Sequence, residues 1–169
     1  DWSVTGVQTC ALPISLANRT MGEPTLRERA LRHLARRDHS RAELARKLAP
    51  YGSAEEVEAV LERMSDLALQ SDTRFAEAWV RSKSGRFGSI RLRHELARRG
   101  VEKSLIDEAI EHECAQSELD RARTVWQSRF DSPPEDHREW AKQARFLQTR
   151  GFATDIIRKL LKESPDESA

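Results

Sequence analysis

Apolar residues recur along this chain at helical spacing, and short polar breaks divide them into separate segments. In the first segment the apolar positions fall on one helical face, at Leu26, Ala30, Leu31 and Leu34. Thr25, with Glu28 three residues later, is typical of a capping box at a helix start. Ser40, followed by Glu43, and Ser53 indicate the starts of two further helices in the same way. The pattern predicts short amphipathic helices.

The same three-helix pattern returns twice. In the second round Ser71 or Asp72 is the predicted N-cap of a helix whose buried face holds Phe75, Ala76, Trp79 and Val80. A loop over 85–89 then leads to a helix that ends at Gly100, and another helix covers 103–113. The third round has predicted helices over 119–130, 138–151 and 154–162, with a proline-containing break after the first of them.

Leucine–glycine pairs mark an internal repeat of about 50 residues. The pairs are Leu48 with Gly52, Leu96 with Gly100, and Leu147 with Gly151. Each glycine is expected to end its helix in a left-handed conformation. Units of this size cannot bury their apolar faces alone, so they stack. The fold class predicted is all-α, with three tandem three-helix (helix-turn-helix-like) repeats in a curved, elongated array.

The predicted domain boundaries follow from this repeat. Residues 21–69, 70–114 and 115–163 form the three repeats, flanked by an extension over 1–20 and an acidic disordered tail over 164–169. The composition supports helices, with 34% charged residues and only 7 Gly and 6 Pro. Two cysteines cannot build a disulfide framework, and no apolar run approaches the ~20 residues of a membrane-spanning helix. We expect a cytoplasmic monomer with no membrane association.

The net charge of +1 conceals a strong segregation of charge between helices. Two of the third helices are acidic, through Glu55, Glu56, Glu58 and Glu62, and through Asp107, Glu108, Glu111 and Glu113. The second helices are basic, and Arg86 precedes the central one. A basic stripe along one side of the array would suit a polyphosphate backbone or an acidic protein groove. The candidate binding residues are Arg41, Arg46, Lys47, Arg86, Arg91, Arg98, Arg99, Lys142, Arg145 and Arg150.

A helical wheel of the central second helix separates its arginines. Arg91 and Arg98 lie on one outer face, with Arg99 beside them. The opposite, apolar arc holds Ile90, Leu92, Leu96 and Ala97. Arg93 falls inside this arc, so it is expected either to extend out to solvent or to pair with an acid of a neighbouring repeat.

No motif indicates catalysis, a metal or a cofactor. Glu111 to Cys114 are consecutive on a helix and point in different directions, which is unsuited to metal ligation. The loop over 84–89 lacks P-loop spacing and is interpreted as a linker, with phosphate contact as the alternative. Trp79 and Trp126 lie on apolar stripes and are expected in the core, whereas Trp140 is left open between core packing and base stacking. The chain is therefore not predicted to be an enzyme.

Residues 1–15 differ from everything that follows. They contain one charge, at Asp1, and they precede an intensely charged helical chain. Residues 4–14 can be back-translated into a sequence that resembles a common sequencing-library adapter. We interpret the segment as non-native, in which case the native start is Met21 or a residue further upstream of the junction. The alternative is an ordinary disordered N-terminal extension.

Four segments carry a family resemblance: RALRHLARRDHSRAELARKL (29–48), SDTRFAEAWV (71–80), IRLRHELARRG (90–100) and ARFLQTRGF (144–152). In this order and spacing they resemble the RecX family of small regulators of the RecA recombinase. The resemblance covers roughly residues 25 to 162. It implies a non-enzymatic protein that binds along the groove of the RecA–DNA filament and limits filament extension, strand exchange and co-protease activity.

The resemblance also assigns roles to residues. The basic second helices would face the filament and its DNA through Arg41, Arg46, Lys47, Arg91, Arg98, Arg99, Arg145 and Arg150. The apolar motif positions are expected in the core, at Leu44, Leu48, Phe75, Leu96, Phe146, Leu147 and Phe152. Two other functions remain open: a direct DNA-binding protein that places the central helix in a major groove, and an inert helical scaffold. Against the first, residues 91–99 lack the Asn, Gln or Ser that groove-reading helices usually carry.

Overall fold

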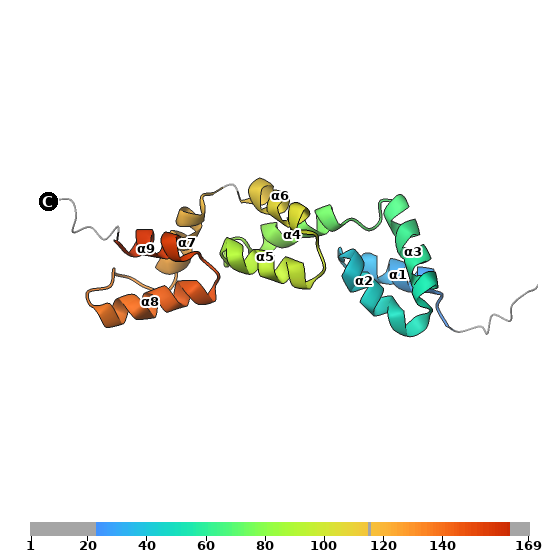
Figure 1. Ribbon diagram of the computed structural model, residues 1–169, viewed down its shortest axis with the longest axis horizontal. Helices are drawn as coiled ribbons and strands as arrows, with labels where there is room; N and C mark the ends of the chain where they lie inside the picture. The colour runs from blue at the N-terminus through green and yellow to red at the C-terminus, as the bar shows by residue number, and fades with distance from the viewer. Residues whose placement is uncertain (1–22, 115, 163–169) are drawn as a thin grey trace, which may run out of the picture.

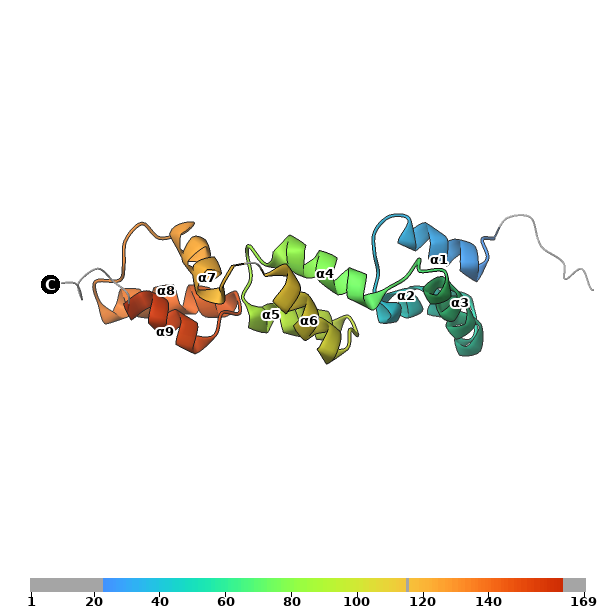
Figure 2. The same cartoon turned by 90° about the horizontal axis from the view of Figure 1, so that it is seen from above.

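The computed structural model describes residues 23–114 and 116–162, which form nine α-helices and one short 3-10 helix, with no strand among them. Repeat 1 comprises α1 (Leu26–Leu34), α2 (Arg41–Leu48), η1 (Ala49–Tyr51) and α3 (Ala54–Asp66). Repeat 2 comprises α4 (Asp72–Lys83), α5 (Ser89–Arg98) and α6 (Lys103–Glu113). Repeat 3 comprises α7 (Glu118–Gln127), α8 (His137–Thr149) and α9 (Thr154–Lys162). The repeats follow one another in an elongated row (Figures 1 and 2), which confirms the predicted tandem three-helix fold.

The helix starts lie where the serine and threonine residues indicate. Thr25 and Glu28 form a reciprocal capping box at α1, and Ser53 forms another with Glu56 at α3. Ser40 accepts a hydrogen bond from the backbone N–H of Glu43 at 3.1 Å. Of the two residues considered for α4, Ser71 is the N-cap. Each cap satisfies a backbone N–H that the helix itself cannot pair.

Each repeat buries its own apolar cluster. In repeat 1 the buried residues are Ala30, Leu44, Leu48, Val57, Leu61 and Met64. Repeat 2 is centred on Phe75, Leu92 and Leu96, and repeat 3 on Leu147, Phe152 and Ile157. The apolar motif positions are buried as predicted, except for Phe146, which is only half-buried. The apolar core is therefore divided into three separate clusters, one in each repeat.

The glycines that follow the second helices do not all play the predicted role. Gly100 and Gly151 adopt φ of 78° and 81°, the expected left-handed conformation. Gly52 is extended, with φ of −169°, so the prediction was wrong there. Pro50 forms part of η1, which already ends the helical segment after Leu48. Gly52 instead allows a close approach, because an added Cβ would lie 2.6 Å from Leu26 Cδ1.

Two expectations about the central and seventh helices were also wrong. Ile90 is 55% exposed and Ala97 is exposed, although both belong to the arc predicted to be apolar and buried. The reason is that α6 covers only the part of this arc that contains Leu92 and Leu96. Helix α7 ends at Gln127 rather than at residue 130. The predicted extension over 1–20 and the tail over 164–169, including the adapter-like segment, lie outside the described residues.

Candidate interaction surface

The three second helices run end to end along the molecule. Figure 1 shows α8, α5 and α2 in one line along the lower edge of the view. The C-terminus of α8 meets the N-terminus of α5, and the C-terminus of α5 meets the N-terminus of α2. We call these three helices the helix line. Because all three point in the same direction, their dipoles are aligned head to tail.

The junction between repeats 2 and 3 is made by the backbone. The N–H of Gly88 donates to the carbonyl of Arg150 at 2.8 Å, and the N–H of Ile90 donates to the carbonyl of Gly151 at 3.1 Å. The N–H of Ser89 donates to Glu118 Oε1 at 3.0 Å. The last carbonyls of a helix and the first N–H groups of the next lack intrahelical partners, and here those following α8 bond to those at the start of α5.

The junction between repeats 1 and 2 has the same geometry but uses side chains. Ser40 Oγ donates to the carbonyl of Arg99 at 2.6 Å. The N–H of Arg41 donates to Asp72 Oδ1 at 2.7 Å. Asp72, considered above as a cap of its own helix, therefore caps α2 of the preceding repeat. Glu118, the first residue of α7, plays the corresponding part at the other junction.

Several candidate cations already have partners within the chain. Arg41 is paired with Glu58, and Arg99 is paired with Glu43 and lies over the Trp79 ring, 3.9 Å from its centroid. Arg91 donates to the carbonyl of Thr149 at 3.0 Å and lies over Phe87, and Arg150 lies over Phe146. Arg91 and Arg99 thus link neighbouring repeats, whereas Arg41 and Arg150 make their contacts within one repeat.

The other six candidate cations form no ion pair within the described residues and are available to a partner. In the described ranges none of them pairs with a carboxylate: Arg46, Lys47, Arg86, Arg98, Lys142 and Arg145. All six are exposed. The side chain of Arg46 reaches the carbonyl of Arg98 at 3.4 Å, so these two cations lie together across the first junction. The structure thus places free positive charge along the whole helix line.

Of the two expectations for Arg93, the extension towards solvent is confirmed, and the pairing with an acid of a neighbouring repeat is not. Arg93 pairs with Asp107 at 2.9 Å, an acid of its own repeat rather than of a neighbour, and its side chain is 49% exposed. The Arg93 hydrogen bond holds the pKa of Asp107 below its ordinary value. Such an exposed ion pair contributes little to stability.

Arg121 is a junction residue that the sequence pattern did not reveal. Its guanidinium is buried, with 5% of the residue exposed, and donates to the carbonyls of Ser84 and Phe87 and to Ser89 Oγ, each at 3.2 Å. An alignment of repeats 2 and 3 by their first N-caps would have pointed to this residue. Arg121 lies four residues after the N-cap Ser117, where the corresponding residue of repeat 2 is the core residue Phe75.

The tryptophans pack inside the repeats. Trp79, Trp126 and Trp140 are partly buried against the apolar clusters of their own repeats. Trp126 donates to Gln143 Oε1 at 2.8 Å. The expectation for Trp79 and Trp126 is confirmed, and the open question for Trp140 is resolved towards packing. Over residues 23–114 and 116–162 no three His, Cys, Asp or Glu side chains gather as a metal site would require, and no helix has the length and apolarity to cross a membrane.

Glu43 is the central carboxylate of the first junction. Burial alone would raise its pKa, but hydrogen bonds from Arg37 and Arg99 outweigh burial and lower the pKa below its ordinary value. A lowered pKa in the folded state stabilises the fold above the ordinary glutamate pKa, and this stability is lost as pH falls through the folded-state value.

The Glu43→Gln variant is therefore expected to be about 2 kcal/mol less stable than the wild type at neutral pH, because two arginines lose their partner. The difference should shrink as pH falls below the ordinary glutamate pKa of roughly 4, and it should vanish below the lowered folded-state value, where Glu43 is protonated. Urea unfolding followed by circular dichroism at several pH values measures it. Glu58→Gln, which breaks a more exposed pair, is the control. A difference for Glu43→Gln that stays constant with pH would contradict the assignment.

The helix line and its charges define the class of this molecule: a helical-repeat protein whose distinctive chemistry lies on an extended basic surface. The sequence matches descriptions of the RecX first three-helix domain over residues 27–64, the second over 71–110 and the third over 116–161. Together these matches cover most of the chain. The chain belongs to the RecX family.

Individual relatives agree with this membership. "Regulatory protein RecX" of Leptothrix cholodnii is 43% identical over 144 residues, covering 85% of this chain and 91% of that protein. The protein of the same name from Pseudomonas fluorescens is 44% identical over 140 residues, covering 80% and 89%. A crystal structure of RecX from Lactobacillus salivarius has 21% identity and a TM-score of 0.69, with coverage of 82% and 93%. At that identity the likeness establishes the fold.

Proposed function

We propose that this protein binds the RecA–DNA filament and modulates, mainly by inhibition, its recombinase, ATPase and co-protease activities. It would act in DNA repair, recombination and control of the SOS response, as a monomeric, cytoplasmic protein without catalytic activity or cofactor. Membership of a family of regulatory proteins supports a regulatory role. The observation that carries the choice of a filamentous partner is the helix line with its free cations.

The helix line suits an extended and repetitive partner. Helices α2, α5 and α8 contain 8, 10 and 13 residues, so end to end they extend roughly 45 Å at about 1.5 Å per residue. The two junctions keep them in register through hydrogen bonds rather than through loops alone. A rigid basic edge of this length can contact successive subunits or phosphates of a polymer with little loss of conformational entropy.

The direct DNA-binding alternative fits the geometry less well. A recognition helix usually inserts its N-terminal residues into the major groove. The N-terminus of α5 is occupied instead, because Gly88 and Ser89 are buried against repeat 3 and their N–H groups are already bonded. Contacts to DNA would therefore come from the sides of the helix line and would be directed to phosphates rather than to base edges.

Reversal of free charge along the line is expected to abolish most of the inhibition. We choose Arg46, Arg98 and Arg145, one exposed cation in each repeat, because none has a carboxylate partner in the described part of the chain. The triple change to Glu should weaken inhibition on the order of tenfold or more, given up to about 1 kcal/mol for each exposed charge. Arg99 is left unchanged because its pairing with Glu43 serves the fold. The measurement is RecA ATP hydrolysis and strand exchange on single-stranded DNA.

A matched control reverses Arg63, Arg158 and Lys159, three exposed cations on the third helices α3 and α9. It should inhibit as the wild type does. Absence of inhibition by the wild type would contradict the proposed function. Inhibition that survives unchanged in the Arg46, Arg98 and Arg145 variant would contradict the helix line as the binding surface. Sequence-specific binding to naked duplex DNA would favour the alternative function.

A further inference from the structure

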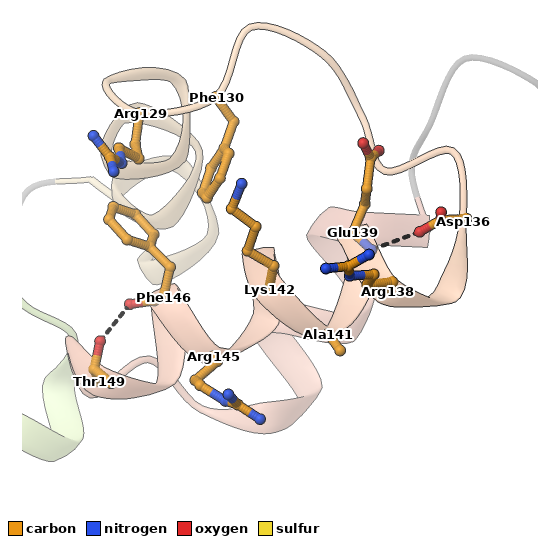
Figure 3. A pocket seen from close by; sticks show the side chains of 10 residues that line it. All are labelled: Arg129, Phe130, Asp136, Arg138, Glu139, Ala141, Lys142, Arg145, Phe146 and Thr149. Atoms are coloured by element: carbon orange, nitrogen blue, oxygen red, sulfur yellow. Dashed lines mark hydrogen bonds between the residues drawn. The ribbon is translucent and has the colours of Figure 1, made fainter.

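A second charged feature lies in repeat 3, beside the helix line. A cleft of about 870 Å³ separates the end of α7 from one side of α8. Figure 3 shows Arg129 and Phe130 on its upper wall and Lys142 reaching up from α8 toward Phe130. Arg145 also lines the cleft and projects from the lower side of α8. The cleft therefore adjoins the helix line, with which it shares Lys142 and Arg145, and it adds Arg129 and Phe130 from beyond the end of α7.

The cations of this cleft have no acidic partner. Arg129, Arg138, Lys142 and Arg145 are exposed, and in the described part of the chain their side chains form neither an ion pair nor a hydrogen bond. Four unpaired cations around one depression create a local positive potential that favours a carboxylate-bearing or phosphate-bearing ligand.

Aromatic rings also line the cleft, and they pack against one another. Phe130 and Phe146 pack edge to face with centroids 5.2 Å apart. The Arg150 guanidinium lies over Phe146 at 3.8 Å, and Trp126 lies next to Phe130 at 6.4 Å. Both phenylalanines are half-buried. This surface is suited to contact with an apolar side chain rather than to stacking of successive bases, which requires open ring faces.

The charge within the cleft is also uneven. Asp136 and Glu139 line its far end, where Asp136 Oδ1 accepts from the Glu139 N–H at 2.6 Å and Glu139 Oε2 accepts from the Glu135 N–H at 3.0 Å. Both carboxylates are held in place by capping α8. A nucleic acid strand, with one phosphate per nucleotide, would bring like charge against them, which is unfavourable. A peptide, by contrast, can carry acidic residues beside Arg129 and Lys142 and none beside Asp136 and Glu139.

We propose that this cleft binds an acidic protein segment in which an apolar side chain is flanked by carboxylates. The apolar side chain contacts Phe130 and Phe146, and the carboxylates pair with Arg129 and Lys142. This assignment rests on the proposed function, since it names the chemistry by which a protein partner, rather than its DNA, is held. Arg129 is not on a second helix, so the charge pattern that revealed the helix line did not include it.

The test uses the full chain and a short fluorescein-labelled peptide that carries one phenylalanine flanked by glutamates. Fluorescence anisotropy at low salt should show binding that weakens as salt is added, because exposed charges are screened. The double variant Arg129→Ala, Lys142→Ala should bind the peptide about tenfold more weakly. Arg158→Ala, Lys159→Ala, which removes equal charge from exposed positions on α9 of the same repeat, should bind as the wild type does.

Two further probes separate the ligand classes without altering the fold. A peptide with serine in place of phenylalanine should bind more weakly, and an oligothymidylate should compete poorly. Equal peptide binding by the wild type and the Arg129, Lys142 variant would overturn the inference. So would full displacement of the peptide by the oligothymidylate, which would make the cleft a phosphate site.

Peptide binding and RecA inhibition, measured on the same protein, test the cleft assignment and the proposed function separately. If the wild type inhibits RecA and fails to bind the peptide, only the cleft assignment is wrong. If the wild type binds the peptide as described and does not inhibit RecA, the cleft does bind acidic segments and the regulatory proposal is wrong. If both hold, Arg129→Ala, Lys142→Ala should inhibit RecA more weakly than the α9 control.

Discussion

Gly151→Ala is expected to destabilise the protein by about 3 kcal/mol. An added Cβ would lie 2.4 Å from Arg91 Cβ and 2.5 Å from Arg91 N, distances at which α5 must move away from α8. Overpacking of this kind costs about 1–3 kcal/mol. The φ of 81° adds about 1 kcal/mol for a residue with a side chain. Because both effects act at the junction of repeats 2 and 3, the helix line should also lose its register there.

Urea unfolding followed by circular dichroism measures this effect. Gly88→Ala, on the opposite side of the same junction, should behave similarly, since its Cβ would lie 2.3 Å from the carbonyl oxygen of Gly151. Gly85→Ala is the matched control: nothing lies within 4 Å of its added Cβ, and its stability should change by less than about 0.5 kcal/mol. Equal stability of the Gly151 and Gly85 variants would show that the close contact between α5 and α8 is not maintained in solution.

Arg121→Ala is expected to have a comparably large effect, about 3 kcal/mol. Its guanidinium carries hydrogen bonds from repeat 3 to two carbonyls and a hydroxyl of the 84–89 loop. Removal leaves those acceptors without this donor in a buried setting, and an unpaired buried polar group costs about 1–3 kcal/mol. The cavity left by a large side chain that is 5% exposed adds to this.

The measurement is the same unfolding experiment, with amide hydrogen exchange over the 84–89 loop as a local readout. Exchange in this loop should accelerate in Arg121→Ala more than exchange in repeat 1, because repeat 1 does not contact the guanidinium. Arg158→Ala, an arginine exposed on α9, should leave both stability and exchange near wild type. Accelerated exchange throughout all three repeats would mean that Arg121 supports the global fold rather than one junction.

Gly151 and Arg121 show that the proposed binding surface depends on residues that hold neighbouring repeats in place. The free cations of the helix line belong to three repeats with separate apolar cores. Their alignment depends on a few junction bonds and on the absence of side chains at Gly88 and Gly151. A variant that disrupts one junction should therefore weaken binding to an extended partner even though every cation remains.

Local patterns determined much of this molecule. Helix starts could be predicted from Thr25, Ser40 and Ser53 because a capping serine or threonine acts on N–H groups within three residues. Apolar periodicity predicted the buried faces, such as Leu44 with Leu48 and Ala76 with Val80, because side chains three or four residues apart share a helix face. The repeat of leucine and glycine predicted the number of units. The limits of the units stay a prediction.

Contacts between residues far apart in the chain were decided only by the tertiary structure. The pattern assigned Arg98 and Arg99 the same surface role and set Arg93 apart from them. The fold instead gives Arg99 a partner 56 residues away, leaves Arg98 free, and pairs Arg93 within its own repeat.

The roles of Gly52, Arg121 and the Arg129 cleft were likewise not predicted from the sequence pattern. Each depends on which segments approach through space, and periodicity along one helix carries no information about that. The sequence by itself therefore determined the helices, their buried faces and the basic character of the second helices. The tertiary structure decided which of those charges hold the repeats together and which remain available to a partner.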